Sequence, residues 1–219
     1  MKLFPTLVVD DFLDDPDYVL NLAKNVEYND PGHTNHPGVA SKDHIGDIDR
    51  ELFEYLHFKL LGIYWDLNNK ISYNTRMDFL KIDYNHKGIL NKGIIHIDSE
   101  HGDLCAGLVY LNKDAMKDTG TSFYKLKDDS YTISQENFLD IIAKHHAGEH
   151  VDNIENICQD HYDKYDETMR VQNQYNRLVS YGSDVYHSST SYGCGQTRYI
   201  MRFFIISLES THQNFPLLR

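Results

Sequence analysis

The spacing of hydrophobic positions changes near residue 78 of this chain. Before that point, apolar residues recur at helical spacing after Asp15-Pro16 and again over 47–67. Asp can accept hydrogen bonds from the free amide groups of a first helical turn, and Pro fits the first helical position, so a helix is expected to begin at this pair. Residues 1–77 are therefore predicted to form a mainly helical support layer, with an exposed loop over 29–45.

From residue 78 onward the apolar residues follow a period of two, which is typical of strands with one buried face. The segments are short, rich in β-branched and aromatic residues, and bounded by turn-forming residues. They are 78–84, 93–98, 104–112, 121–126, 176–181, 184–188 and 197–208. Strands of this number and length predict a β-sandwich or jelly-roll barrel.

A polar, His-rich stretch over 134–170 interrupts the strand pattern. Its apolar residues recur at helical spacing: Phe138, Leu139, Ile141 and Ile142. We interpret this stretch as a helical insertion, because a chain of 219 residues has the length of one ordinary domain. The predicted organisation is one α+β domain over 1–219, with a mainly β core over 78–208 and a tail at 209–219.

The chain is acidic, with 21 Lys and Arg against 33 Asp and Glu and a formal net charge of -12. This charge disfavours duplex nucleic acid as a partner, because phosphate binding needs a basic surface. No stretch has the roughly 18 apolar residues of a membrane helix, and the first residues do not resemble a signal peptide. Cys105, Cys158 and Cys194 form no CxxC pair, so we expect a soluble protein of the reducing cytoplasm. The oligomeric state stays open.

Candidate metal chemistry begins with the tripeptide His-x-Asp, which occurs at 96–98, 101–103 and 161–163. His96 and Asp98 lie in an extended apolar segment, where residues two apart leave the same face of a strand. They therefore offer a nitrogen ligand and an oxygen ligand that converge. The other two tripeptides lie in a turn and in a polar segment, and we expect their side chains to be solvated.

A third ligand should come from a strand that is distant in sequence, and His187 meets this condition. Two imidazoles and one carboxylate leave several metal positions open, an arrangement typical of non-heme Fe(II) oxygenases. Arg198 opens the last long strand, and its planar guanidinium suits a carboxylate. Arg202 lies on the same face and competes for that role. An interior Arg is costly unless it is paired, so a bound dicarboxylate would explain it.

The order of HID, GLVYLNKD, GTSFYKL, YHSS and TRYIMRFFI resembles that of the Fe(II)/2-oxoglutarate-dependent dioxygenases. The resemblance covers about 80–208 and is to the prolyl-4-hydroxylase-like branch, including its small bacterial or phage type. It implies a double-stranded β-helix core and Fe(II) bound by His96, Asp98 and His187. It also implies that Arg198 holds the far carboxylate of 2-oxoglutarate.

The activity that this resemblance implies is hydroxylation of a substrate, coupled to oxidative decarboxylation of 2-oxoglutarate by O2. Tyr84 is expected to support the same carboxylate as the arginine, and Arg202 is expected to contact the substrate. The substrate is a small molecule or a residue, such as proline, in a peptide or protein. The sequence departs from the family pattern at Thr121, in the Gly-rich loop 192–195 and in the long insertion, which leaves the substrate open.

Two alternatives stand beside the oxygenase. Residues 146–150 match the H-x-x-E-H signature of a zinc hydrolase, with His146, Glu149 and His150 as the chemical groups. That signature needs a helix, which Gly148 weakens by ~1 kcal/mol relative to Ala. The second alternative is a non-catalytic jelly-roll module that binds a metal or a partner. Formation of succinate that depends on Fe(II) would separate the oxygenase from both.

Overall fold

The computed structural model describes residues 5–30, 36–66, 68, 70–83, 87–98, 104–128, 135–193 and 195–209. The helices are α1 (Pro16–Asn25), α2 (Ile45–Ile48), α3 (Arg50–Tyr64), α4 (Gln135–His146) and α5 (Ile154–Tyr162), with a 3-10 helix η1 (Gly88–Asn91). The strands are β1 (Leu7–Val9), β2 (Gly38–Ala40), β3 (Ser72–Ile82), β4 (Cys105–Tyr110), β5 (Thr121–Leu126), β6 (Tyr165–Val171), β7 (Leu178–Gly182), β8 (His187–Ser189) and β9 (Arg198–Glu209).

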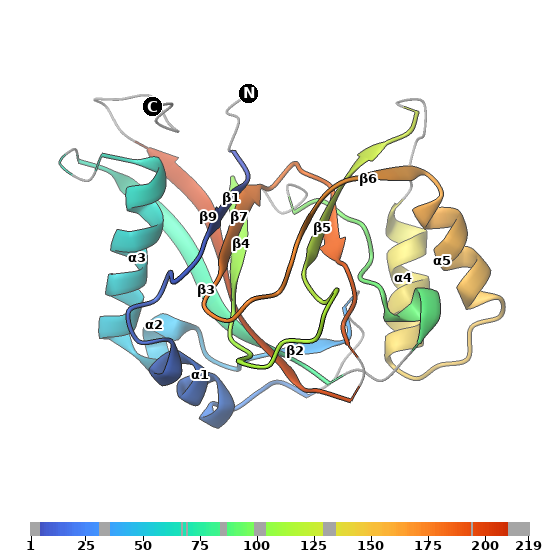
Figure 1. Cartoon of the computed structure of the whole chain (residues 1–219), viewed down its shortest axis with the longest axis horizontal. Coiled ribbons are helices and arrows are strands. Elements are labelled where there is room, and N and C mark those ends of the chain that lie inside the picture. Colours follow the sequence, from blue (N-terminus) through green and yellow to red (C-terminus); the bar gives the residue numbers. More distant parts are fainter. Residues whose placement is uncertain are drawn as a thin grey trace.

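The described residues form a mixed α and β structure with two antiparallel sheets. The larger sheet has the order β1-β7-β4-β9-β3-β2, and the smaller has the order β6-β5-β8. Helices α1 to α3 lie beside the larger sheet, and α4 and α5 lie beyond the smaller one (Figure 1). Within this part of the chain, no helix is long and apolar enough to cross a membrane.

The two N-terminal helix predictions are largely confirmed. α1 begins at the predicted pair, and the Asp15 carboxylate accepts a hydrogen bond from the Tyr18 amide at 2.9 Å. The helix predicted over 47–67 is instead divided, because Asp49 adopts an extended conformation with a φ of -149°. Asp49 then caps α3 by accepting a bond from the Leu52 amide at 3.0 Å. The last residue of the predicted helix lies outside the described part.

The strand predictions over 104–112, 121–126, 176–181 and 197–208 are confirmed, with small shifts at their ends, as β4, β5, β7 and β9. Alternation in β9 shows why the pattern was informative. Met201 and Phe203 pack into the core between the larger sheet and the helices, whereas Ile200 packs into a second core with Tyr110 and Phe123. The second core lies between the two sheets, because Tyr110 comes from β4 and Phe123 from β5.

Two predictions in the N-terminal half are wrong. β3 begins at Ser72 rather than at residue 78, so the mainly helical layer does not extend over 72–77. The first residues of β3 are exposed and polar and carry no alternation; their pairing with the end of β9 makes them a strand. The predicted loop 29–45 contains β2, which is too short for a periodic signal and pairs with the end of β3.

The insertion predicted over 134–170 is helical in its first part, where α4 and α5 lie, and wrong at its end. β6 begins at Tyr165 and pairs along its length with β5. Only its terminal residues, Tyr165 and Val171, are buried, and the five between them are exposed. A strand with so little buried surface shows no alternation of apolar and polar residues in the sequence, so only its pairing with β5 reveals it.

The segment 93–98 is extended but does not form a regular strand. It is joined to β8 by one antiparallel bridge, in which the His96 amide donates to the His187 carbonyl at 3.1 Å and the His187 amide donates to the His96 carbonyl at 3.0 Å. It therefore continues the smaller sheet beyond β8. The strand predicted over 184–188 is shifted as well, because 184–186 lie before β8 begins.

Candidate metal centre

His96, Asp98 and His187 lie together at the edge of the smaller sheet. Their ligand atoms all lie within 4.8 Å of one another. Nε2 of His96 is 3.5 Å from one Asp98 carboxylate oxygen, and Nε2 of His187 is 3.6 Å from the other. The described part of the chain contains no other group of three His, Cys, Asp or Glu side chains with this spacing. The structure thus brings these three predicted ligands together; their binding of a metal stays a prediction.

The main chain places these side chains. The bridge between His96 and His187 sets two imidazoles on neighbouring extended segments, with ring centroids 4.4 Å apart. The Asp98 amide donates to the Ser183 carbonyl at 2.8 Å, which holds the carboxylate end of the segment against the loop before β8. Residues far apart in sequence therefore meet through backbone hydrogen bonds rather than through their side chains alone.

Hydrogen bonds to carbonyl groups also orient both rings. Nδ1 of His96 is 2.9 Å from the Ile94 carbonyl, and Nδ1 of His187 is 2.9 Å from the Val185 carbonyl. A carbonyl can only accept, so both Nδ1 atoms carry the hydrogen. In a neutral imidazole the other nitrogen then keeps its lone pair, and both Nε2 atoms face Asp98. Bonds of this kind select the tautomer of histidine metal ligands.

The protonation states fit a divalent cation. Burial lowers the pKa of His187 to about 4, so the ring is neutral at neutral pH. Burial raises the pKa of Asp98, but His187, His96 and Arg202 outweigh this effect and bring it to about 2. Two lone pairs and a carboxylate that face one another repel unless a cation or a proton lies between them. Neutral imidazoles and an ionised carboxylate are the forms that bind metals.

Arg198 is a charged residue in the interior between the sheets, and it is only 3% exposed. Its Nη1 donates to the Ser191 carbonyl at 3.3 Å and lies 3.5 Å from the Ser189 hydroxyl. Its Nε and Nη2 are buried and have no hydrogen-bond partner among the described residues. Burial lowers the pKa of Arg198, which means that the surroundings destabilise its charge. An anion bound beside Arg198 would supply the missing acceptors.

Arg202, the competing arginine, has a different environment. Its Nε and Nη2 donate to the two carboxylate oxygens of Asp78 at 2.8 and 3.0 Å. Asp78 lies opposite Arg202 in the pairing of β3 with β9, and its side chain is 9% exposed. The guanidinium of Arg202 is therefore already paired, whereas that of Arg198 has no ion-pair partner in the part of the chain that the structure describes. Asp78 was not among the predicted site residues, although an aspartate among apolar strand residues was a usable signal.

Tyr84, predicted to support the same carboxylate as Arg198, lies outside the described residues. The aromatic group that the structure places beside Arg198 is Tyr110, whose ring centroid is 5.4 Å from the guanidinium carbon. Its hydroxyl is hydrogen-bonded to the Thr121 hydroxyl at 2.7 Å. The alternation of β4 could have indicated Tyr110, because it places this ring on the face toward the smaller sheet. Thr121, a departure from the family pattern, thus takes part in a buried polar contact.

Of the other two His-x-Asp tripeptides, the one at 161–163 does not join the site. His101 and Asp103 lie outside the described residues. His161 was expected to be solvated, and this was wrong: it lies in α5 and is 3% exposed. The polar sequence around it was misleading because α5 presents one face to the protein and the rest to solvent. Asp163, just beyond the helix, is exposed.

The zinc-hydrolase signature is not formed. α4 ends at His146, and Gly148 has a φ of +84°, a left-handed conformation that ends the helix. Glu149 and His150 therefore lie beyond the helix that would have to hold two ligands on one face. The His150 side chain is 89% exposed and pairs with Asp152 at 3.0 Å. The described residues provide no support for hydrolase chemistry here.

Comparison with known proteins adds a family and a fold. A family model described as a family of unknown function, DUF6445, matches residues 3–191, which is most of the chain. The chain belongs to this family. No curated protein matches the sequence of this DUF6445 protein.

Solved structures share the fold of this DUF6445 protein. A prolyl-4-hydroxylase from Pseudomonas putida is 15% identical, with 91% of each chain covered and a TM-score of 0.55. A prolyl hydroxylase from Trichoplax adhaerens, in complex with a peptide fragment of hypoxia inducible factor, is 12% identical, with 91% and 82% covered and a TM-score of 0.55. HygX from Streptomyces hygroscopicus, with nickel and 2-oxoglutarate bound, is 11% identical, with 94% and 83% covered and a TM-score of 0.56. At these identities the likeness shows the fold alone.

Proposed function

We propose that this DUF6445 protein is a non-heme Fe(II) dioxygenase that couples oxidative decarboxylation of 2-oxoglutarate to hydroxylation of a substrate. One observation carries the proposal: a cluster of two imidazoles and a carboxylate shares the space between the sheets with a buried arginine that has no ion-pair partner among the described residues. Ser189, which Arg198 approaches, lies two residues after His187 on the same short strand. A metal bound by His187 and an anion bound by Arg198 would therefore both lie beside β8.

Different residues of the chain would bind the metal and the co-substrate. His96, Asp98 and His187 would hold Fe(II) and leave other coordination positions open for 2-oxoglutarate and O2. The iron, when bound, supplies the oxidation chemistry, and the protein supplies binding, orientation and a dry environment. Arg198 would bind the far carboxylate of 2-oxoglutarate at a position that is almost fully shielded from solvent.

The finer parts of the proposal concern fold and substrate. Two facing antiparallel sheets, with the site between them, support a double-stranded β-helix of the prolyl-4-hydroxylase-like type. Arg202, held by Asp78 on the same face of β9 as Arg198, would contact the substrate. The substrate is a small molecule or a residue of a peptide or protein. Both classes appear among the structural neighbours: the Trichoplax enzyme was solved with a peptide, and HygX was also solved with hygromycin B.

Uncoupled turnover tests the proposal without a known substrate. Metal-free protein is supplied with Fe(II), 2-oxoglutarate and O2, and succinate is measured. We expect slow succinate formation that requires Fe(II) and is abolished in Asp98→Ala. Asp152→Ala, which removes an aspartate that pairs with an exposed histidine, is the control and should retain it. Tight metal binding without succinate formation would overturn the oxygenase and support the non-catalytic module.

A further inference from the structure

The segment 93–98, which carries His96 and Asp98, lies at the edge of the smaller sheet. One side of the segment is paired with β8, and the other side is not paired with a strand among the described residues. The bridge to His187 occupies the amide and the carbonyl of His96. Main-chain groups of successive residues in an extended segment point to opposite edges. The Ile95 carbonyl therefore faces away from β8, where the smaller sheet offers no further strand among the described residues. Without a hydrogen-bond donor from another element, this carbonyl would have no partner in the protein.

Helix α5 of the insertion covers that edge. Nε2 of His161 donates to the Ile95 carbonyl at 3.1 Å. The hydroxyl of the next residue, Tyr162, donates to the Gly93 carbonyl. Two consecutive side chains thus bind two alternate carbonyl groups of the segment that carries His96. Covering an exposed sheet edge with a helix is a common protein device, and here the covered edge belongs to the metal site.

Apolar packing joins the same elements. Ile94 forms a small core with Ile142 of α4 and Cys158 of α5, separate from the two cores of the sheets. Phe138 of α4 stacks on the His161 ring with a centroid distance of 4.0 Å and an interplanar angle of 14°. The ring that donates to Ile95 is therefore held by both helices of the insertion.

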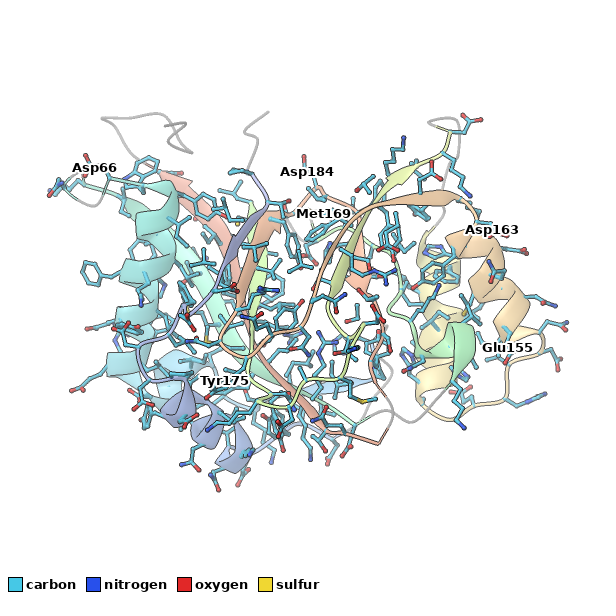
Figure 2. The ribbon with its side chains drawn as sticks, viewed as in Figure 1. Asp66, Glu155, Asp163, Met169, Tyr175 and Asp184 are labelled. Atoms are coloured by element: carbon cyan, nitrogen blue, oxygen red, sulfur yellow. The ribbon has the colours of Figure 1, made fainter. Side chains whose placement is uncertain are left out.

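The end of α5 that carries His161 and Tyr162 also leads into β6, the strand at the opposite edge of the smaller sheet. Asp163 marks the end of α5 next to β6, and Glu155 lies in the first turn at the other end (Figure 2). After α5 the chain enters β6, where Tyr165 pairs with Leu126 of β5. The insertion therefore extends from β6 to the segment 93–98, across the outer side of the smaller sheet.

We propose that the insertion is a clamp for the metal site, in which His161 and Tyr162 are positioning residues that hold the segment 93–98 and so set the place of the His96 imidazole. This inference rests on the proposed metal centre. The Ile94 carbonyl, which orients the His96 ring, lies between the two carbonyl groups that the clamp binds. A shift of the segment would move both the ligand and the group that orients it.

The affinity for Co(II) tests the clamp. Co(II) is titrated into the metal-free full chain, and binding is measured by visible absorption. His161→Phe keeps a flat ring on Phe138 and removes the donor to Ile95. We expect Co(II) affinity to fall by about tenfold, in the range seen when groups that orient ligands are removed. His161→Gln restores a donor and should recover most of the affinity. His150→Phe, the same change at an exposed position of the insertion, should match the wild type.

Two further measurements keep the test decisive. Tyr162→Phe removes only a hydroxyl, and it should also weaken Co(II) binding and speed amide hydrogen exchange over 93–98. It replaces His161→Phe if that variant does not fold. Wild-type affinity and an unchanged Co(II) spectrum in both variants would overturn the clamp, even with lowered thermal stability. If wild-type protein binds no Co(II), the metal centre itself is overturned and the clamp with it. If Co(II) binds but no succinate forms, the oxygenase fails and the clamp stands.

Discussion

The backbones of His96 and His187 form a doubly hydrogen-bonded antiparallel pair, with N to O distances of 3.1 and 3.0 Å. In such a pair the Cα atoms lie about 5.5 Å apart, close enough for both side chains to reach one ion. The two imidazoles are thus placed before any metal binds. Asp98 enters the same space from the segment that carries His96.

Metal binding should stabilise the folded chain. A ligand that binds only the folded state, at a free concentration about 100 times its Kd, adds about 2.7 kcal/mol to the free energy of unfolding. We expect a rise of this order in thermal unfolding experiments with Co(II), reversed by a chelator. Asp98→Asn should lose most of it, because an amide replaces the carboxylate ligand. An equal rise in both proteins would place the metal elsewhere.

Replacing Arg198 should separate stability from co-substrate binding. Arg198→Met removes a buried charge that lacks an ion pair among the described residues. The free energy of unfolding of the ligand-free protein should therefore rise by about 1 kcal/mol or more, and its unfolding temperature should rise with it. The same variant should lose the stabilisation that 2-oxoglutarate gives the wild type, while its Co(II) affinity stays unchanged. Thermal unfolding with and without 2-oxoglutarate measures both effects. A less stable variant that still responds to 2-oxoglutarate would contradict the role of Arg198.

Replacing Arg202 should lower the free energy of unfolding, in contrast to replacing Arg198. Arg202→Met leaves the largely buried Asp78 carboxylate without its bidentate partner. Breaking such a pair costs about 3 kcal/mol, because one charge stays buried and unpaired. The free energy of unfolding from urea titration should fall accordingly. The double variant Asp78→Asn/Arg202→Met should recover part of the loss, and no recovery would show that the pair is not the cause.

His161 should make stability depend on pH. Burial lowers the pKa of His161 to about 4, against the opposing effect of its bond to Ile95. Lys164 and His96 add smaller effects in the same direction as burial. The unfolded chain takes up this proton near the usual value of 6.5, so stability is lost as the pH falls from 6.5 toward 4, by about 3 kcal/mol in total.

The measurement is urea unfolding of the metal-free protein between about pH 7 and about pH 4.5. His161→Phe has no proton to gain at this position, so its free energy of unfolding should fall less steeply than that of the wild type. His150→Phe, at an exposed position, should follow the wild-type slope. Parallel curves for the wild type and His161→Phe would contradict a buried, neutral His161.

Local chemistry allowed parts of this protein to be predicted from the sequence. Asp15 and Pro16 begin a helix because capping and a fixed φ act within one turn, and β9 was readable because its residues alternate between two cores. β6 and β2 were not readable, because one has almost no buried face and the other is three residues long. Both are strands only because a partner strand supplies their hydrogen bonds.

The candidate site divides in the same way. His96, Asp98, His187 and Arg198 could be proposed from residue type and order alone, since a metal and a carboxylate demand particular side chains. Only the tertiary structure decided that Arg202 has Asp78 as a partner and that Arg198 has no ion-pair partner within the described ranges, because pairing depends on strand register. Only the tertiary structure placed His161 against the segment that carries His96. A long-range contact of this kind leaves no periodic signal in the chain, because its two residues meet only after the helices and sheets have packed.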